Sequence, residues 1–419
     1  MTPLRFAMVT TFYPPYNFGG DGMGILRLSQ ALVRRGHHVT VIHDADAYVT
    51  LAGGEPKGAF ADDGVEIVTL RTPLGIASNL ATQQTGRPVV HGERITRELR
   101  ERNIDVTVFH NISLVGGPGV LQLRRGTSLY MAHEHWLVCP THVLWRFRRE
   151  LCDEKKCVRC QLSYRRPPQL WRHTGYLERE LRHVDTFIAM SEFSRRKHRE
   201  FGFPRDMEVV PYFLPESDDR PIDRSDDQSP HDRPYFLFVG RLEQIKGLQD
   251  VIPVFERFER ADLLIAGAGD YGNALRALAA GNPRVVFLGQ VAPAELSRYY
   301  RHASALIVPS VCYETFGIIL IEAFRQGTPV VARRLGPFPE IVDAAQGGDL
   351  FTDPAELEAA LHRYLDDPQR RGRLGAQARQ AFLANWSEQA VIPRFLSVVR
   401  GAARLRGDHA VMQALEGVS

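Results

Sequence analysis

Short apolar runs alternate with amphipathic stretches along most of this chain. In the first half, runs with the length and β-branched content of buried strands occupy residues 6–11, 38–43, 65–70, 106–110, 128–132 and 186–190. The same rhythm resumes at residues 235–239, 262–266, 284–288, 305–308 and 329–332. Strands that alternate with helical patterns are typical of parallel sheets with crossover helices. The pattern therefore predicts an α/β protein with two doubly wound sheets.

A stretch rich in proline and acidic residues separates the two series. Residues 214–234 contain four prolines and no sustained apolar pattern, which is typical of a linker. We therefore expect an N-terminal domain at residues 1–213, a second domain at 235–385 and a C-terminal helical segment at 386–419. Because doubly wound sheets bind ligands outside the carboxyl ends of their strands, two such domains are expected to form a cleft.

Composition and charge narrow the class of protein. A chain of 419 residues exceeds what one hydrophobic core usually supports, in agreement with two domains. Apolar and charged fractions of 44% and 24% exclude a mainly disordered chain, and the net charge of +3 argues against nucleic acid as the principal partner. No run of 18 apolar residues occurs, and the first apolar stretch is too short for a signal peptide. We expect a soluble, cytoplasmic protein.

Two glutamates flank the start of a predicted helix in the second domain. Glu314 falls in the turn after the strand at 305–308, and Glu322 falls on the helix expected at 317–326. Unpaired N–H groups at a helix N-terminus favour phosphate oxygens, and carboxylates accept hydrogen bonds from sugar hydroxyls. The arrangement indicates a site for a nucleoside diphosphate that carries a polyhydroxylated group. Taken alone, the segment is equally compatible with a solvated loop acid and a helix acid favoured by the macrodipole. The N–H groups concerned belong to Thr315, Phe316, Gly317 and Ile318.

Two cations follow the first strand of the second domain. Arg241 and Lys246 lie in the segment Gly-Arg-Leu-Glu-Gln-Ile-Lys-Gly, directly after residues 235–239. A departing diphosphate needs its charge neutralised as the bond to it breaks, and two cations at the carboxyl end of a strand can supply this. Surface lysines and arginines are usually solvated, but their occurrence together with the glutamate pair favours a phosphate site.

A glycine-rich loop follows the first strand of the N-terminal domain. Its glycines, Gly19, Gly20, Gly22 and Gly24, would let the backbone approach a phosphate closely. A flexible connector would look similar, and the spacing lacks the Gly-x-Gly-x-x-Gly order of dinucleotide-binding loops, which argues against a dehydrogenase.

Taken together, these motifs resemble those of glycosyltransferase family 4, whose members are retaining, nucleotide-sugar-dependent enzymes of the GT-B type. The resemblance covers residues 4–400 approximately and rests on Gly-Arg-x4-Lys-Gly, Glu-x7-Glu and the Gly-Gly loop. It implies two Rossmann-like domains that face each other across a deep cleft, with the last helix, near 386–405, returning to the first domain.

The resemblance also implies roles for individual residues. Glu314 would hold hydroxyls of the donor sugar and Glu322 the ribose, while Gly20 and its neighbour Gly19 would meet the donor phosphates. Backbone groups of residues 289–291, the last of which is Val291, would meet the base. Two further glycines, Gly267 and Gly269, form another turn in the second domain, where they are expected to permit close approach to the donor.

Histidines follow two strands of the N-terminal domain. His110 ends the strand at 106–110, where either a structural or a cleft-facing role is compatible with the pattern. The family resemblance implies that His110 lies beside the donor sugar. His133 closes the next strand and is interpreted as an acceptor-side residue. The segment His-Glu-His-Trp is not a metalloprotease motif, since that motif needs His-Glu-x-x-His on a helix.

An Asp-Ala-Asp segment, Asp44 to Asp46, invites comparison with the metal-binding Asp-x-Asp of GT-A glycosyltransferases. Because it follows a strand in a chain that already supplies two cations for the diphosphate, we interpret it as a solvated turn. We therefore expect no catalytic metal.

Four clustered cysteines have the spacing C-x12-C-x4-C-x2-C. The closing pair has the knuckle spacing of structural zinc sites, so we expect zinc rather than free thiols, with His142 able to replace one thiolate.

The region 146–172 also has a net charge of 9 − 3 = +6 and interleaved aromatic residues, so it could contact an anionic lipid headgroup at the inner membrane face or a phosphorylated acceptor. A solvated face remains the alternative, and RNA binding has little support. Cys312 stands apart and is expected to pack as a small apolar group. The clustered cysteines are Cys139, Cys152, Cys157 and Cys160.

These observations predict a retaining glycosyltransferase that moves a sugar from a nucleoside diphosphate to a hydroxyl acceptor such as a glycolipid, a polysaccharide or a small metabolite. A nucleotide-sugar epimerase or a phosphorylase on the same fold remains an alternative. So does a non-catalytic nucleotide-sugar binding protein.

Overall fold

The computed structural model describes residues 2–56, 63–215 and 228–417, which divide into two compact units. The first unit comprises Met1–Pro215 and Glu388–Ser419, and the second comprises Glu216–Ser387. Most of the expected linker, residues 216–227, lies outside the described residues.

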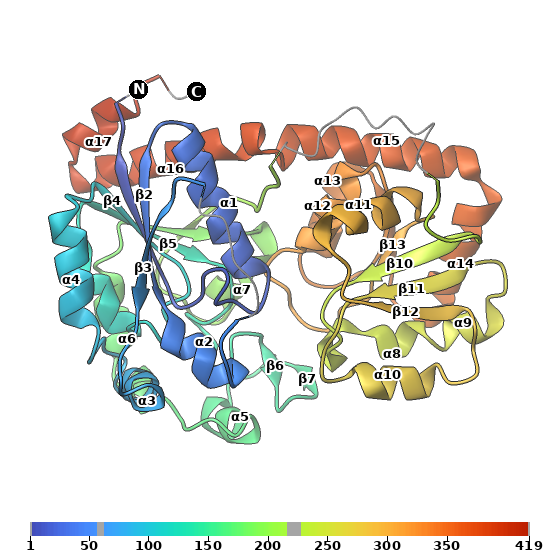
Figure 1. The fold of residues 1–419 in the computed structure, drawn as a ribbon, viewed down its shortest axis with the longest axis horizontal. Helices are drawn as coiled ribbons and strands as arrows, with labels where there is room; N and C mark the ends of the chain where they lie inside the picture. Colours follow the sequence, from blue (N-terminus) through green and yellow to red (C-terminus); the bar gives the residue numbers. More distant parts are fainter. Residues whose placement is uncertain (1, 57–62, 216–227, 418–419) are drawn as a thin grey trace. The chain divides into compact units, whose positions relative to one another are not determined.

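The first unit contains a seven-stranded parallel sheet with the order β3-β2-β1-β4-β5-β8-β9 (Figure 1). Its central strands are buried along nearly their whole length, as expected for a parallel sheet covered on both faces. The strands are β1 (Arg5–Thr10), β2 (His38–Asp44), β3 (Glu66–Leu70), β4 (Val106–Phe109), β5 (Thr127–Ala132), β8 (Thr186–Ala189) and β9 (Met207–Val209).

Helices and short 3-10 turns connect these strands. Local capping sets some of their starts, as when the Asp44 carboxylate accepts a hydrogen bond from the backbone N–H of Ala47 at the start of α2. The helical segments of this part are α1 (Gly20–Arg34), α2 (Ala45–Ala52), α3 (Ile76–Thr85), α4 (Gly92–Glu101), η1 (Pro118–Leu123), α5 (Cys157–Ser163), η2 (Leu170–His173), α6 (Tyr176–Leu181) and α7 (Glu192–Glu200).

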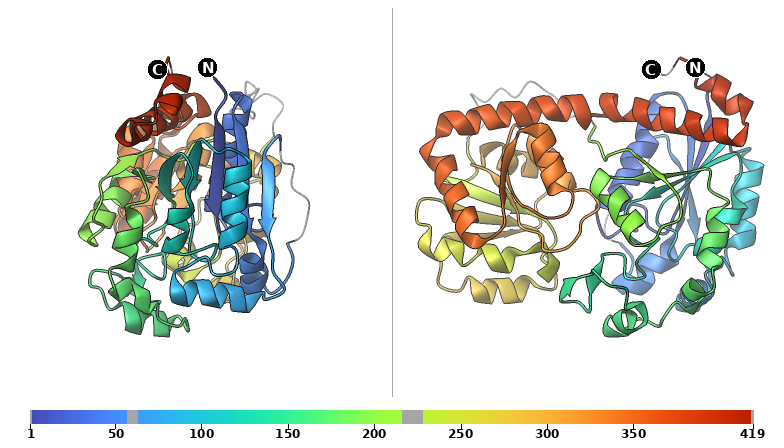
Figure 2. Two further views of the ribbon diagram at one scale, coloured as in Figure 1. Left: turned by 90° about the vertical axis from the view of Figure 1, so that its left-hand side faces the viewer. Right: turned by 180° about the vertical axis from the view of Figure 1, so that it is seen from behind.

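The C-terminal helices belong to the first unit. Helix α16 (Glu388–Arg406) packs against β5 and α1, and α17 (His409–Ala414) follows it (Figure 2). The ring of Phe395 lies 6.5 Å from that of Phe6 on β1, and the carboxylate of Glu388 pairs with Arg35 at 2.6 Å. The expected return of the last helix to the first domain is therefore confirmed.

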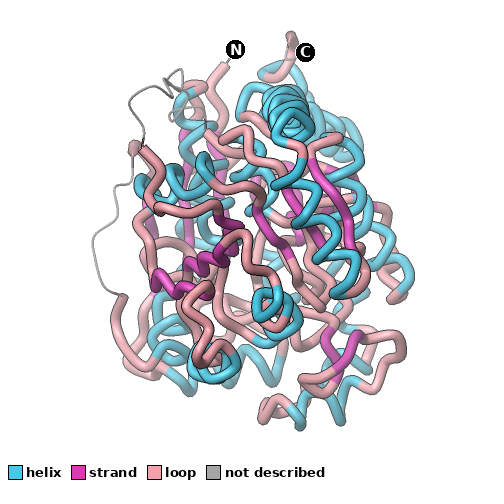
Figure 3. Tube along the Cα trace, turned by 90° about the vertical axis from the view of Figure 1, so that its right-hand side faces the viewer, coloured by secondary structure: helices cyan, strands magenta, loops and turns pink. Residues whose placement is uncertain are grey.

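The second unit contains a six-stranded parallel sheet with the order β12-β11-β10-β13-β14-β15, and its strands lie between helices (Figure 3). Its strands are β10 (Tyr235–Val239), β11 (Asp262–Ala266), β12 (Val285–Gly289), β13 (Leu306–Val308), β14 (Val330–Arg333) and β15 (Gly348–Phe351). Its helical segments are η4 (Gln244–Lys246), α8 (Leu248–Val251), α9 (Val254–Arg257), α10 (Gly272–Leu278), α11 (Pro293–His302), α12 (Ile318–Arg325), α13 (Phe338–Ala345), α14 (Pro354–Asp366) and α15 (Pro368–Asn385).

The eleven strands expected from the apolar pattern are confirmed, with ends that differ by one residue at most. The structure adds β9 and β15 at the sheet edges, where short or partly exposed strands carry weak patterns. No helix within the described residues is both long and apolar enough to span a membrane.

Candidate functional site

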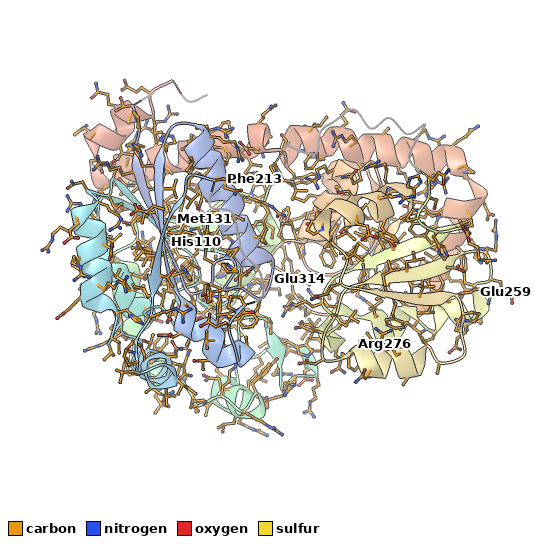
Figure 4. All side chains as sticks on the ribbon, viewed as in Figure 1. His110, Met131, Phe213, Glu259, Arg276 and Glu314 are labelled. Atoms are coloured by element: carbon orange, nitrogen blue, oxygen red, sulfur yellow. The ribbon has the colours of Figure 1, made fainter. Side chains whose placement is uncertain are left out.

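The carboxyl ends of adjacent strands gather the charged residues of the second unit. Arg241 and Lys246 follow β10. Glu314, which is labelled in Figure 4, follows β13, the neighbour of β10 in the sheet. Loops that leave adjacent parallel strands at the same edge lie close together, and ligands of such sheets bind there. The topology therefore brings together residues that are about 70 positions apart in the sequence.

Lys246 and Glu314 form an ion pair. The Lys246 Nζ lies 2.5 Å from Oε1 of Glu314, and the Ser310 hydroxyl donates to the same oxygen at 3.1 Å. The backbone fixes this arrangement, because the N–H of Val311 donates to the carbonyl of Ile245 at 2.9 Å. The pair is thus set between two loops that hold each other.

Gly247 is required for that contact. It has φ +78°, and a Cβ at this position would lie only 2.0 Å from the carbonyl oxygen of Pro309. A larger residue would separate the loop after β10 from the loop after β13. The glycine that ends the Arg-x4-Lys-Gly motif therefore lets the lysine reach its partner.

Both members of the pair are ionised at neutral pH. Burial lowers the pKa of Lys246, but the Glu314 carboxylate outweighs it and the net pKa is raised. Burial raises the pKa of Glu314, but the Lys246 ammonium outweighs it and the net pKa is lowered. The edge of the sheet thus presents an ammonium and a carboxylate, which suit a phosphate and a sugar hydroxyl respectively.

Arg241 lies at the same edge and is exposed to solvent. Its side chain is 55% exposed and forms an ion pair with Glu243 at 2.7 Å. Its charge also contributes to the lowered pKa of Glu314, which places the guanidinium near the pair. The long side chain can exchange Glu243 for an anionic ligand at little cost, because an exposed ion pair contributes about 1 kcal/mol or less.

The turn and helix after β13 have the predicted form. Glu314 lies in the turn, and Glu322 lies in the second turn of α12, whose first turn is preceded by Gly317. Gly317 has φ +151°, and a Cβ there would lie 2.8 Å from Leu320 and 2.9 Å from Phe338. Only glycine fits this close approach, which positions Thr315, Phe316 and Ile318 around the helix N-terminus.

Glu322 has a protein partner within the unit. The Tyr300 hydroxyl on α11 donates to Oε2 of Glu322 at 2.9 Å. Burial and the nearby carboxylate raise the pKa of Tyr300, so its proton remains available to this bond. The bond fixes the orientation of Glu322 on the helix.

Gly267 and Gly269 support the loop that carries Arg241. A Cβ on Gly267 would lie 1.9 Å from the carbonyl oxygen of Gly240, and one on Gly269 would lie 2.5 Å from that of Leu242. The close approach that these glycines allow in the structure is therefore between two loops of the protein. Val291 follows β12 and is half-buried.

In the first unit, two histidines and a tyrosine form a hydrogen-bonded chain. His110 follows β4 and His133 follows the neighbouring β5. His110 Nδ1 lies 2.8 Å from His133 Nε2, and His133 Nδ1 lies 2.5 Å from the Tyr212 hydroxyl. At the other end, His110 Nε2 lies 3.4 Å from the sulfur of Met8. Figure 4 labels His110 within this buried region.

This imidazole chain is uncharged at neutral pH. Burial, with a smaller contribution from His133, lowers the pKa of His110 well below its usual value, and burial lowers that of His133 to about 3. Burial also keeps Tyr212 protonated by raising its pKa. Because the sulfur of Met8 cannot donate, the consistent direction runs from the Tyr212 O–H to His133, then to His110, then to the sulfur.

The glycine-rich segment forms the start of α1. Gly19 is the N-cap and Gly20 the first helical residue, and the carbonyl of Gly19 accepts a hydrogen bond from the Asn17 side chain at 2.9 Å. Gly24 packs under Tyr212, since a Cβ there would lie 2.3 Å from the tyrosine ring. This glycine therefore allows the helix to contact the imidazole chain.

The cysteine insert folds into a hairpin of β6 (Trp145–Arg146) and β7 (Glu150–Leu151) followed by α5. Cys139, Cys152, Cys157 and Cys160 are free thiols, and burial and the other thiols raise the pKa of Cys152 to about 12. Among the described residues, three or more ligand atoms within 4.8 Å of one another occur only elsewhere in the first unit. The zinc site therefore has no support from this geometry and stays a prediction. His142 Nδ1 is hydrogen-bonded to the carboxylate of Glu134.

Two interpretations of single residues can be assessed directly. The solvated turn expected at Asp44 is wrong, because the Asp44 side chain is fully buried and caps α2. Cys312 is buried, as expected for a small apolar group.

Three residues near the candidate sites had no signal in the sequence. Tyr212 contacts His133 across 79 positions, Tyr300 contacts Glu322 across 22, and Ser310 contacts Glu314 from the preceding turn. The residues around Tyr212 carry no periodic or motif pattern. A hydroxyl close to an expected carboxylate, as at Ser310, is the only one of the three that spacing could have suggested.

Several known proteins resemble this chain. It is 34% identical over 181 residues to a glycogen synthase of Mycobacterium tuberculosis, covering 40% of this chain and 42% of that protein. It is 31% identical over 237 residues to a D-inositol 3-phosphate glycosyltransferase of Corynebacterium kroppenstedtii, covering 50% and 51% respectively. The chain thus spans about half or less of the length of these relatives.

Solved structures show the same fold. A sucrose-phosphate synthase from Thermosynechococcus elongatus has a TM-score of 0.71 and 20% identity, covering 95% of this chain and 98% of its own. HepE of Anabaena, in complex with UDP, has a TM-score of 0.66 and 17% identity, covering 95% and 100%. These likenesses agree with the two parallel sheets and identify a GT-B architecture.

Family descriptions match the two parts of the sequence side by side. Residues 18–218 match "Glycosyltransferase Family 4", and residues 219–381 match "Glycosyl transferases group 1". Together the matches run without a gap over most of the chain. The chain belongs to glycosyltransferase family 4.

Proposed function

We propose that this protein transfers a glycosyl group from a nucleoside diphosphate sugar to a hydroxyl acceptor, with retention at the anomeric carbon. The observation that carries the proposal is the Lys246–Glu314 pair at the carboxyl edge of the second sheet, beside the N-terminus of α12. It supplies a cation for a phosphate and an acceptor for a sugar hydroxyl in one place. Family membership supports the reaction class, and HepE of the same fold is described with UDP.

Each candidate site residue of the second unit has a role in the proposed reaction. Lys246, Arg241 and the N–H groups at 315–318 bind the diphosphate and neutralise its charge as it leaves. Glu314 accepts hydrogen bonds from the sugar, and Glu322 binds the ribose. Val291 lies beside the base, and Gly267 and Gly269 hold the Arg241 loop in place.

The proposed displacement occurs on one face of the sugar. The bond from the anomeric carbon to the diphosphate oxygen breaks, and a bond to the acceptor oxygen forms on the same side. The proton of the acceptor hydroxyl passes to the departing phosphate oxygen, so the step needs no separate base and no metal ion. The charge that develops on the leaving group is what Lys246 stabilises.

The first unit contributes neutral groups in this proposal. His110 donates a hydrogen bond from its Nε2–H to the donor sugar when this N–H turns away from the sulfur of Met8. His133, on the acceptor side, orients His110. Gly19 and Gly20 meet the donor phosphates through the start of α1.

Nucleotide release from a panel of donor sugars, with and without acceptor alcohols, tests the proposal. We expect release to depend on an acceptor, and the product to keep the anomeric configuration of the donor by NMR. Conversion of a donor to another sugar without an acceptor would identify an epimerase. Nucleotide-dependent thermal protection without any release would identify a binding protein and refute the proposed transfer.

We also propose that the cysteine insert binds structural zinc and contacts anionic membrane. Leu162 and Leu170 are 58% and 65% exposed beside a basic segment, and Gln83 on α3 donates to the carbonyl of Pro167, which joins the insert to α3. Metal analysis of purified protein, compared with a Cys157→Ser/Cys160→Ser variant, tests zinc binding.

Sedimentation with anionic and neutral vesicles tests membrane contact, and a Leu162→Ser/Leu170→Ser variant should bind less to the anionic vesicles.

A further inference from the structure

Three metal-binding side chains meet at the carboxyl edge of the first sheet, apart from the sites described above. One ligand atom each from Asp44, Asp46 and His91 lie within 4.8 Å of one another. Asp44 is the last residue of β2, Asp46 lies in the first turn of α2, and His91 precedes α4. Three separate elements of the chain therefore converge on one point.

Two of these side chains carry buried polar atoms that have no hydrogen-bond partner among the residues the structure describes. Asp44 is 0% exposed and His91 is 6% exposed. The atoms are Asp44 Oδ2 and His91 Nε2, and within that part of the chain neither forms a hydrogen bond. An unpaired buried polar atom destabilises the folded state, and such atoms are a minority in folded proteins. Two of them in one cluster indicate a common ligand.

The carboxylates are held by backbone donors on one side only. The N–H of Ala47 donates to Asp44 Oδ1 at 3.2 Å, and the N–H of Thr72 donates to Asp46 Oδ2 at 2.6 Å. In each carboxylate one oxygen is oriented by the backbone and the other remains for a further ligand. Metal sites commonly hold their ligands by such outer hydrogen bonds.

The separation of the ligand atoms suits a shared ion better than a direct bond. No hydrogen bond joins Asp44 to His91, although their ligand atoms lie within 4.8 Å. Two bonds of about 2.0–2.2 Å each, from an ion between them, can join ligand atoms up to about 4.4 Å apart, which is compatible with this upper limit. Arg94, whose charge acts on His91, lies 3.6 Å from Glu98.

We propose that Asp44, Asp46 and His91 bind one divalent transition-metal ion such as Mn²⁺ or Zn²⁺. Two carboxylates and one imidazole favour these ions over Ca²⁺, which requires six to eight oxygen ligands. Asp46 is half-buried, so the remaining coordination positions are open to water or to a ligand oxygen. The ion ties β2, α2 and α4 together at the edge of the sheet where doubly wound folds bind ligands. This site does not depend on the proposed glycosyl transfer.

Binding of Mn²⁺ to the chelator-treated full chain tests the site, because thiolates of the cysteine insert bind Mn²⁺ poorly. Loss of the free Mn²⁺ signal in electron paramagnetic resonance should give about one ion per chain. Asp46→Asn and His91→Gln should each weaken binding by at least about 10-fold. Asp46→Asn can still accept the Thr72 hydrogen bond, and His91 makes no capping bond, so both variants should fold.

Matched controls separate this site from other acids and thiols. Asp63→Asn changes an exposed acid of the same unit, and Cys157→Ser/Cys160→Ser changes the insert, so both should bind Mn²⁺ as the parent does. Addition of Mn²⁺ should also raise the melting temperature of the parent and not that of Asp46→Asn. Failure of the parent to bind at millimolar Mn²⁺ overturns the proposal. So does binding that Asp46→Asn and His91→Gln leave unchanged.

Discussion

The two units place opposite kinds of polar group at the carboxyl edges of their parallel sheets. In the second unit this edge carries the ion pair of Lys246 and Glu314, whose side chains are 20% and 25% exposed. In the first it carries the imidazole chain of His110, His133 and Tyr212, in which His110 is only 1% exposed. The same type of edge thus holds an ion pair in one case and an uncharged hydrogen-bonded chain of side chains in the other.

A partner of opposite charge explains the difference. Burial opposes the ionisation of Lys246 and of Glu314, but their mutual attraction outweighs it, so both stay ionised. A fully buried imidazole would lose hydration on protonation without a carboxylate to compensate, so His110 and His133 stay neutral. The comparison assigns ionic stabilisation to the second unit and neutral hydrogen bonding to the first.

The largest effect is expected from the charged side of this comparison. Lys246→Met should lower the turnover of nucleotide-sugar by about 100- to 1000-fold, because it removes a preorganised cation from the leaving group. Steady-state kinetics with the best donor measures the loss. Lys246→Met/Glu314→Gln, in which no carboxylate remains unpaired, should restore stability but not turnover. Near-normal turnover in either variant would remove Lys246 from the proposed chemistry.

A smaller effect, on the pH dependence of the unfolding free energy, should test whether the buried histidines are neutral. Burial lowers the pKa of His198 on α7 from 6.5 to about 4, although a hydrogen bond to the Ser194 carbonyl partly opposes it. Because the folded pKa lies below the unfolded one, the stability from a neutral His198 is full above about pH 6.5 and is lost as the pH falls toward 4. The loss at pH 5 is about 2 kcal/mol.

Replacement of this histidine should flatten the acid side of the stability curve. His198→Phe, which keeps an aromatic ring, should lose less unfolding free energy between pH 7 and pH 5 than the parent, while the exposed His409→Gln should behave as the parent. His133, with its pKa lowered to about 3, acts in the same direction, and Asp44, with its pKa raised to about 7, opposes it. Denaturant unfolding at several pH values measures the slopes. Parallel curves for His198→Phe and the parent would contradict the buried neutral state.

The smallest effect concerns the donor at the end of the imidazole chain. Tyr212→Phe leaves His133 Nδ1 without the tyrosine proton and should lower the unfolding free energy by about 1 kcal/mol. Tyr16→Phe, which removes an exposed hydrogen bond with Arg71, should change it by less than about 0.5 kcal/mol. Chemical denaturation compares the two. Equal stability of both variants would mean that the hydrogen bond from Tyr212 to the imidazole chain does not stabilise the folded protein.

Local patterns were sufficient for the elements but not for the contacts between them. The central strands are continuous apolar runs, and the turn and helix positions of Glu314 and Glu322 follow from the strand before them and from Gly327 after them. The edge strands β9 and β15 were missed because half-exposed residues weaken the apolar signal.

Burial and long-range partners could not be read from spacing. Asp44 ends a strand and begins a helix, a position that is solvated in many proteins but is fully covered here. Tyr212 contacts His133 only because the fold brings together two residues that are 79 positions apart in the sequence. The glycines at 267 and 269 predicted a close approach to the donor, and what the structure describes there is a close approach to another loop of the protein.

The packing of α16 on β5 makes the first unit discontinuous in sequence, with the whole second unit inserted between Pro215 and Glu388. A fragment that stops at residue 215 would expose the apolar side chain of Phe6 that Phe395 covers, and would leave Arg35 without Glu388. Isolation of this half therefore requires a circularly permuted or ligated gene that rejoins residues 388–419 to it. The second unit, by contrast, can be excised as one continuous stretch.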